Sequence, residues 1–129
     1  MTGWFEELPE QCPEADAKFP NGEVYYRLIE GENICCNDFW SHRKIWPHKV
    51  FKTTECRARS VSMFEEFSQC AKLLLLPLHE KKRIAEVRLT PDAGLLKRTG
   101  TAGHNSWWRS DAFDPVANAK LVENCAEHG

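Results

Sequence analysis

Val24-Tyr25-Tyr26-Arg27-Leu28-Ile29 is the stretch of this chain that most clearly indicates a sheet. It is rich in aromatic and β-branched residues, which favour strands, and the Asn21-Gly22 pair before it is typical of a turn. Because side chains alternate along a strand, positions 24, 26 and 28 share one face, and Arg27 lies on the other face with its neighbours at 25 and 29. The stretch therefore predicts a strand with two differently composed faces.

Two more segments alternate in the same way. Residues 84–89 place Glu86 and Arg88 between apolar positions. In residues 53–61, charged side chains at positions 55, 57 and 59 alternate with Cys56 and Ala58. Both patterns predict strands. The turn residues at 90–94 follow, and we expect residues 95–97 to fold back onto 84–89 as a hairpin.

Helix signals occur at three places. Ser62 and Glu65 fit the Ser-x-x-Glu capping box, and apolar residues at helical spacing follow until Pro77. Asp114-Pro115 is a favourable helix start, with an apolar stripe at positions 116, 119, 122 and 126. A short helix over 39–44 is also expected, capped by the residue at position 37 or 38.

The whole chain, residues 1–129, is expected to be a single domain of the α+β class. The predicted elements give a small mixed or mainly antiparallel sheet with two longer helices. Residues 1–22 are rich in proline and acidic groups, which predicts a Pro-rich, extended N-terminal arm. Its apolar residues, Trp4, Phe5 and Leu8, either fix the arm to the body or meet a partner protein.

The formal net charge is −2, so the chain has no overall basic field to attract nucleic acid or an anionic membrane. Binding to either would need a local patch. Basic residues at 42–44 lie between Trp40 and Trp46, a combination that suits single-stranded nucleic acid, but a solvated surface is the more favoured interpretation. The longest apolar run, residues 73–76, is too short to span a bilayer. We therefore expect no membrane partner, and nucleic acid is not a favoured one.

The six cysteines and the N-terminus bear on location. Acidic residues occur early and no apolar segment follows, so the start of the chain does not resemble a signal peptide. This predicts a cytoplasmic location with reduced thiols. No closely spaced Cys or His pairs indicate a metal site, and no phosphate-binding glycine motif is present. No spacing pairs Cys56 with a base.

Residues 104–111, His-Asn-Ser-Trp-Trp-Arg-Ser-Asp, form the main candidate site. They follow a glycine-rich run at 99–103 and are expected to form a loop. The adjacent Trp107 and Trp108 offer rigid surfaces and N–H donors for a ligand. An alternative is that one of the two indoles fills the core.

The order of Arg27, the Ser60-Val61-Ser62 segment and the later Glu86 loosely resembles the ADP-ribosyltransferase superfamily. The resemblance implies an NAD-binding fold in which Arg27 holds the phosphates or ribose and Ser60 and Ser62 support the nicotinamide ribose. Glu86, or His104 in its place, would then polarise the ribose or the acceptor. The Glu-x-Glu or Gln-x-Glu of that superfamily is absent here, so a non-catalytic relative is also implied.

Two function hypotheses follow. The first is an enzyme acting on a nucleotide-type ligand such as NAD, with Arg27, Glu86 and His104 as catalytic residues and with serine and indole groups beside the cofactor. The second is a non-catalytic module that binds a protein or peptide through its tryptophans and N-terminal arm. The enzyme requires a concave pocket that contains at least two of the three catalytic candidates. The module requires an exposed apolar patch.

Overall fold

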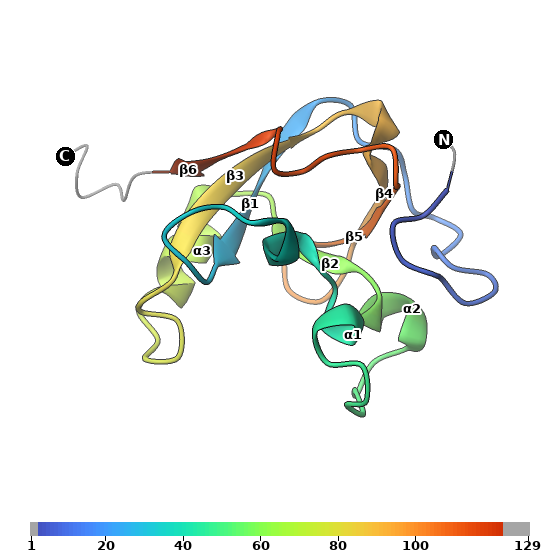
Figure 1. Cartoon of the computed structure of the whole chain (residues 1–129), viewed down its shortest axis with the longest axis horizontal. Helices are drawn as coiled ribbons and strands as arrows, with labels where there is room; N and C mark the ends of the chain where they lie inside the picture. Colours follow the sequence, from blue (N-terminus) through green and yellow to red (C-terminus); the bar gives the residue numbers. More distant parts are fainter. Residues whose placement is uncertain (1–2, 123–129) are drawn as a thin grey trace.

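Six antiparallel strands form one sheet, in the order β4-β5-β2-β1-β3-β6 (Figure 1). This computed structural model describes residues 3–122 of the chain. The predicted α+β class with a mainly antiparallel sheet is confirmed. The strands are β1 (Glu23–Ile29), β2 (Val61–Phe64), β3 (Arg83–Leu89), β4 (Gly94–Arg98), β5 (His104–Arg109) and β6 (Ala119–Val122).

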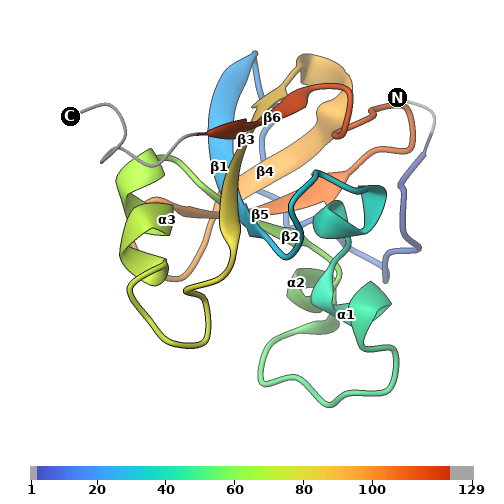
Figure 2. The ribbon, with the colours of Figure 1, turned by 60° about the vertical axis from the view of Figure 1, so that its left-hand side comes forward.

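The strands predicted at 24–29 and 84–89 are confirmed as β1 and β3, which pair over their full lengths from Glu23↔Leu89 to Ile29↔Arg83. Directly paired residues share a face of a sheet. Val87 and Leu89 are fully buried on the face that they share with Tyr25 and Arg27, the inner face, and the twist of the sheet carries β4 and β5 across β1 and β3 (Figure 2). The core lies on this inner face: Phe39, Val61, Met63, Val87, Leu89, Ala93, Leu96, Trp107 and Phe113.

Residues 94–98 are a strand as expected, but the predicted hairpin with 84–89 is wrong. β4 pairs with β5 instead, from Gly94↔Arg109 to Arg98↔Asn105. A 3-10 helix, Pro91–Ala93, turns the chain after β3, and Gly94 follows it with a φ of 127°. A Cβ at position 94 would lie 2.0 Å from the Trp108 carbonyl oxygen, so only glycine allows this approach. The turn thus redirects the chain into a new pair of strands.

The helix predicted from the Ser62 capping box is wrong in its first turn. Residues 61–64 form β2, because Val61 and Met63 alternate into the core and β2 pairs with both β1 and β5. Burial of this apolar face overrides the local helix signal. Helix α3 (Phe67–Leu73) begins later, where Glu66 and Gln69 form the capping box.

The expectation of two longer helices is also wrong. Apart from α3, the α-helices in residues 3–122 are α1 (His42–Ile45) and α2 (Glu55–Ala58), with four residues each. Helix α2 replaces the strand predicted over 53–61, because the Thr54 side chain accepts a hydrogen bond from the Arg57 N–H and caps a helical turn. Residues 39–44 are likewise divided between a 3-10 helix, Cys36–Phe39, and α1.

No helix starts at Asp114-Pro115. The Asp114 carboxylate accepts from the N–H groups of Val116 and Ala117, which makes a turn, and the chain then enters β6 beside β3. Here strand pairing with the exposed edge of β3 is favoured over helix formation. The last part of the predicted helix, beyond residue 122, lies outside the described residues.

Residues 3–22 contain no helix and no named strand, only isolated bridges from Trp4 to Ser110 and from Lys18 to Leu96. The Phe5 N–H also donates to the Arg109 carbonyl oxygen. These contacts agree with the expectation that apolar residues near the N-terminus fix this segment to the body. In residues 3–122 no helix is long and apolar enough to cross a membrane.

A disulfide between Cys12 and Cys56 ties the N-terminal segment to α2. The prediction that all thiols are reduced is therefore wrong. Sequence could not show the pair, because the two cysteines are 44 residues apart and meet only in the fold. Since disulfides persist mainly in oxidising compartments, this bond is mildly at odds with the expected cytoplasmic location.

Glu14 adds an ion-pair cluster beside the disulfide. Hydrogen bonds from Arg57 and Lys97 lower its pKa from an ordinary 4.5 to about 2. A carboxylate with a lowered folded-state pKa stabilises the fold above its unfolded pKa, and this stability is lost as the pH falls toward the folded value. We expect Glu14→Gln to lower the free energy of unfolding by about 1 kcal/mol at pH 7, because the partly exposed pair is screened by solvent.

Urea unfolding at several pH values tests this expectation. The difference between Glu14→Gln and the wild type should shrink below pH 4.5 and vanish near pH 2. A difference that stays constant over that range would mean that Glu14 contributes through packing rather than through charge.

Candidate functional site

The segment expected to form a ligand-binding loop is strand β5 together with the two residues that follow it, and both of its tryptophans are fully buried. Trp107 faces the core, where its indole N–H donates to the Ala93 carbonyl oxygen at 3.0 Å. Trp108 faces the opposite side of the sheet and donates to the Cys56 carbonyl oxygen at 2.7 Å. With their surfaces covered and their donors used, neither indole presents a surface to a ligand.

Arg27 lies on the inner face of β1, and its guanidinium already donates hydrogen bonds within the protein. Its Nε donates to the Asp38 carbonyl oxygen at 2.6 Å, and its Nη1 donates to the Ser62 carbonyl oxygen at 2.7 Å. Burial lowers the pKa of this guanidinium to about 10, so it keeps its charge at neutral pH. Arg27 thus joins β1 to β2 and to the 3-10 helix Cys36–Phe39.

Glu86 and His104 lie on the outer face, opposite to Arg27. The strand registers place them in one row, His104↔Phe64↔Tyr26↔Glu86. Three strand spacings separate the two ends of this row, about 14 Å between their backbones. Two aromatic side chains stand between them. Glu86 pairs with Lys120 at 3.1 Å, and the Nδ1 of His104 is 2.9 Å from the Thr99 carbonyl oxygen.

The two serines of the resemblance also have local roles. The Ser60 hydroxyl donates to the Arg57 carbonyl oxygen at 2.7 Å, at the end of α2. Ser62 is paired with Ser106 in the sheet, and its carbonyl accepts from Arg27. The structure therefore distributes the predicted catalytic and cofactor-binding residues over both faces of the sheet and does not gather them around one cavity.

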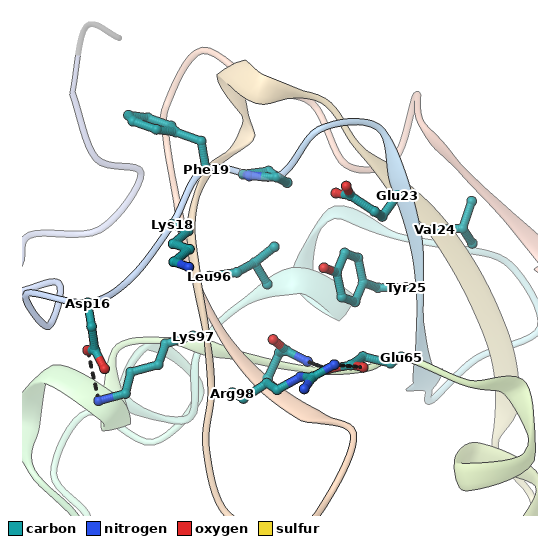
Figure 3. A pocket seen from close by; sticks show the side chains of 12 residues that line it. Asp16, Lys18, Phe19, Glu23, Val24, Tyr25, Glu65, Leu96, Lys97 and Arg98 are labelled. Carbon is teal, nitrogen blue, oxygen red and sulfur yellow. Dashed lines mark hydrogen bonds and ion pairs between the residues drawn. The ribbon is translucent and has the colours of Figure 1, made fainter.

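A cavity of about 670 Å³ lies elsewhere, between the N-terminal segment and the inner face of β1 and β4. Figure 3 shows how the side chains lie: the Tyr25 hydroxyl points from β1 toward Leu96 of β4, and Lys18 and Phe19 lie along the opposite rim. The lining consists of Asp16, Lys18, Phe19, Pro20, Glu23, Val24, Tyr25, Glu65, Leu96, Lys97, Arg98 and Asn105. Of the 104–111 segment only Asn105 is among them, and none of the predicted catalytic and cofactor-binding residues is. A smaller cavity of about 300 Å³ contains Glu86 alone of that set.

The carboxylates that line the larger cavity all have partners. Glu65 accepts two hydrogen bonds from Arg98, at 2.7 and 2.9 Å, and one from Asn105 at 2.8 Å. These contacts lower the pKa of Glu65, with the Arg98 hydrogen bond as the largest cause. Asp16 pairs with Lys97, and Glu23 accepts from the Asn21 N–H.

Two donors in the cavity remain available. In the described part of the chain, Lys18 forms no ion pair and the Tyr25 hydroxyl has no hydrogen-bond partner. Desolvation raises the pKa of Tyr25, and the negative charges of Glu23 and Glu65 add to this effect. Tyr25 therefore stays neutral and keeps its O–H donor at physiological pH. With two of its three acidic groups, Asp16 and Glu65, held in ion pairs and these donors open, the cavity favours a ligand that carries acceptor atoms.

The sequence does not predict this site because its residues come from five separate segments: 16–20, 23–25, 65, 96–98 and 105. Tyr25 was placed correctly on the same face as Arg27, but nothing local to it indicates β4 or the 16–20 segment as its neighbours. The bridge between Lys18 and Leu96 is the long-range contact that closes the cavity. A weak signal existed in Lys97-Arg98, a basic pair at the end of an otherwise apolar strand.

Within residues 3–122, no three His, Cys, Asp or Glu side chains gather closely enough to hold a metal ion. Comparison of the chain with protein-family models, curated proteins and solved structures finds no match. The function must therefore be argued from the site itself.

Proposed function

We propose that this protein is a non-catalytic binding module for a small aromatic anion of the nucleotide type, held in the cavity between β1, β4 and residues 16–20. The observation that carries the proposal is the combination of a neutral Tyr25 hydroxyl and a free Lys18 ammonium with two carboxylates, Asp16 and Glu65, that are already paired. A ligand with a phosphate or carboxylate group would satisfy these donors without displacing an existing ion pair.

The size and walls of the cavity support the same ligand class. A volume of about 670 Å³ lies within the range of small-molecule sites. Leu96, Pro20 and the ring of Tyr25 provide apolar surface for a planar body, and Lys18 and Arg98 supply positive charge at the rim. Such a site binds through shape and a few polar contacts, as small-molecule pockets usually do.

The groups that surround these donors within residues 3–122 favour binding over catalysis. General acid–base work needs a group with a shifted pKa within reach of the reacting atom. The charges of two carboxylates, Glu23 and Glu65, act on Tyr25. Glu65 is held by three hydrogen bonds that lower its pKa, so it is a poor proton acceptor. Arg27, Glu86 and His104 do not line this cavity.

Thermal unfolding with added ligands tests the proposal. We expect a nucleoside monophosphate, NAD or ADP-ribose to raise the melting temperature, since a ligand at a hundred times its Kd adds about 2.7 kcal/mol of stability. Lys18→Gln should weaken the binding about tenfold, as expected for the loss of one charged hydrogen bond. Tyr25→Phe should weaken it by a smaller factor, because it removes a neutral donor.

Lys120→Gln is the matched control, because Lys120 is an exposed lysine on β6 that does not line this cavity. It should bind as the wild type does. A thermal shift that survives Lys18→Gln and Tyr25→Phe but disappears in Arg27→Ala, Glu86→Gln or His104→Ala would contradict the proposal and support the ADP-ribosyltransferase-like enzyme. The absence of any shift with this set of anions would also contradict it.

A further inference from the structure

Two loops carry most of the exposed apolar surface of the described chain. The first loop, residues 42–52, surrounds the connection between α1 and α2. The second loop, residues 72–83, surrounds the connection between α3 and β3. They contain six of the eight large hydrophobic side chains that are exposed within residues 3–122. The most exposed are Val50 at 90% and Leu75 and Leu78 at 82% each, and Trp46 is 56% exposed.

The same loops concentrate positive charge. Together they contain eight of the seventeen Lys and Arg residues of the chain but only one of its nineteen acidic residues, Glu80. Because the whole chain has a net charge of −2, the rest of the molecule is strongly acidic by comparison. Some of these cations are engaged, such as Lys82 with Glu30. Lys49, Lys52, Lys72 and Lys81 are exposed, with no ion pair among the described residues.

The first loop holds its apolar residues outward. Arg43 lies inside the loop, where its Nη1 donates to the carbonyl oxygens of Pro47 and Lys49 at 2.8 and 2.9 Å. Its Nε and Nη2 pair with Glu55 of α2. The Phe51 ring lies beneath this guanidinium at 4.8 Å. The conformation is thus fixed from within, and Trp46 and Val50 are left on the outside.

The second loop is also ordered by its own backbone. Consecutive turns are closed by hydrogen bonds from the N–H of Leu76 to Leu73, of His79 to Leu76 and of Lys82 to His79. Pro77 lies at the centre of these turns. A loop that is ordered in this way while it exposes leucines is typical of an interaction surface rather than of a collapsed core segment.

Both loops extend to the same end of the molecule. In Figures 1 and 2 they form its lower end, below α1, α2 and α3, and this holds after the rotation that relates the two views. A flat surface approaching that end would therefore meet the exposed residues of both loops together. Two acidic residues outside the loops, Glu30 and Glu55, are paired with the loop cations Lys82 and Arg43.

We propose that this end of the protein docks on the surface of an anionic lipid bilayer. Charge complementarity selects an anionic partner, and five of the six exposed apolar residues on the loops are aliphatic: Ile45, Val50, Leu75, Leu76 and Leu78. Aliphatic side chains enter the acyl boundary, whereas single-stranded nucleic acid is held mainly by stacking on aromatic rings. Trp46 suits the headgroup level, where indoles gather.

This is surface binding and requires no membrane-spanning segment. It also supplies the local patch that a chain of net charge −2 needs in order to approach an anionic membrane. Each inserted leucine should change the partition coefficient about tenfold, and each lysine at the headgroups about fivefold. The proposal is independent of the ligand cavity, whose lining includes no residue of either loop.

Vesicle co-sedimentation of the full chain tests the proposal. We expect binding to phosphatidylcholine–phosphatidylserine vesicles, little binding to phosphatidylcholine alone, and weaker binding at high salt. Leu75→Ser with Leu78→Ser should lower binding to the mixed vesicles at least tenfold, and Lys49→Gln with Lys81→Gln should lower it by a similar factor. All four side chains are exposed, so the fold should tolerate the changes.

Phe19→Ser is the matched control, because Phe19 is an exposed apolar residue at the distant cavity rim. It should bind vesicles as the wild type does. A second readout is the fluorescence of Trp46, which should shift to the blue with mixed vesicles and lose that shift in Trp46→Phe. Equal sedimentation of the wild type and the leucine variant would overturn the proposal. So would tight binding of a single-stranded oligonucleotide that the lysine variant abolishes and the leucine variant leaves unchanged.

Discussion

Trp107→Ala should lower the free energy of unfolding by about 3–5 kcal/mol, the usual cost of removing a large buried aromatic side chain. Trp107 is fully buried, its ring meets Phe113 edge to face at a centroid distance of 5.8 Å, and its N–H is bonded to the Ala93 carbonyl. The substitution would leave a large cavity, and the Ala93 carbonyl would keep only its hydrogen bond from the Ser110 N–H. For a domain whose total stability is about 5–15 kcal/mol, the loss is a large fraction.

Urea unfolding at pH 7 measures the effect, and Trp46→Ala is the control. Trp46 is 56% exposed and should change the free energy of unfolding by less than about 0.5 kcal/mol. Trp107→Phe should fall between the two, because it retains part of the buried surface. If Trp107→Ala and Trp46→Ala were equally mild, Trp107 would be a surface residue, as the loop interpretation of residues 104–111 supposed.

Replacing both Cys12 and Cys56 with alanine should lower the free energy of unfolding by about 4 kcal/mol. The bond closes a separation of 44 residues, and a crosslink of that span restricts the unfolded chain strongly. It also fixes the segment that carries Glu14 and Lys18, so the variant should bind the proposed ligand more weakly. The exposed thiols of Cys35 and Cys36 provide the control.

Chemical denaturation of the oxidised protein, the reduced protein and the Cys35→Ser/Cys36→Ser variant tests this prediction. The control should unfold with the wild type, and reduction should shift the midpoint as far as the double alanine variant does. Alkylation without a reductant should leave Cys12 and Cys56 unmodified. Modification of both under native, non-reducing conditions would show that the bond does not form in solution.

The two long strands of the sheet, β1 and β3, can be predicted from the sequence. Residues 24–29 are rich in β-branched and aromatic side chains, residues 85–89 alternate, and turn residues lie beside both segments, so local pattern and tertiary pairing agree. Residues 61–64 show the opposite case. A Ser-x-x-Glu box and an alternating strand overlap there, and only the partners β1 and β5 decide between them.

The candidate site was harder to predict for the same reason. Local composition indicates a candidate site at the adjacent tryptophans. Such residues suit a binding surface and a core equally well, and here both are buried. The cavity depends instead on the bridge that carries residue 18 to β4, and on Tyr25 facing it across the opening. Contacts between segments so far apart in sequence leave no local pattern.

Chemical-shift mapping by NMR is the most direct test of the central claim, that ligand binding occurs in the cavity between β1, β4 and residues 16–20. On titration with a nucleoside monophosphate, we predict shifts concentrated at the amides of Lys18, Tyr25 and residues 96–98. The indole signals of Trp107 and Trp108 should remain unchanged. Shifts concentrated instead around Arg27, Glu86 and His104 would contradict the account and return the site to the ADP-ribosyltransferase-like arrangement.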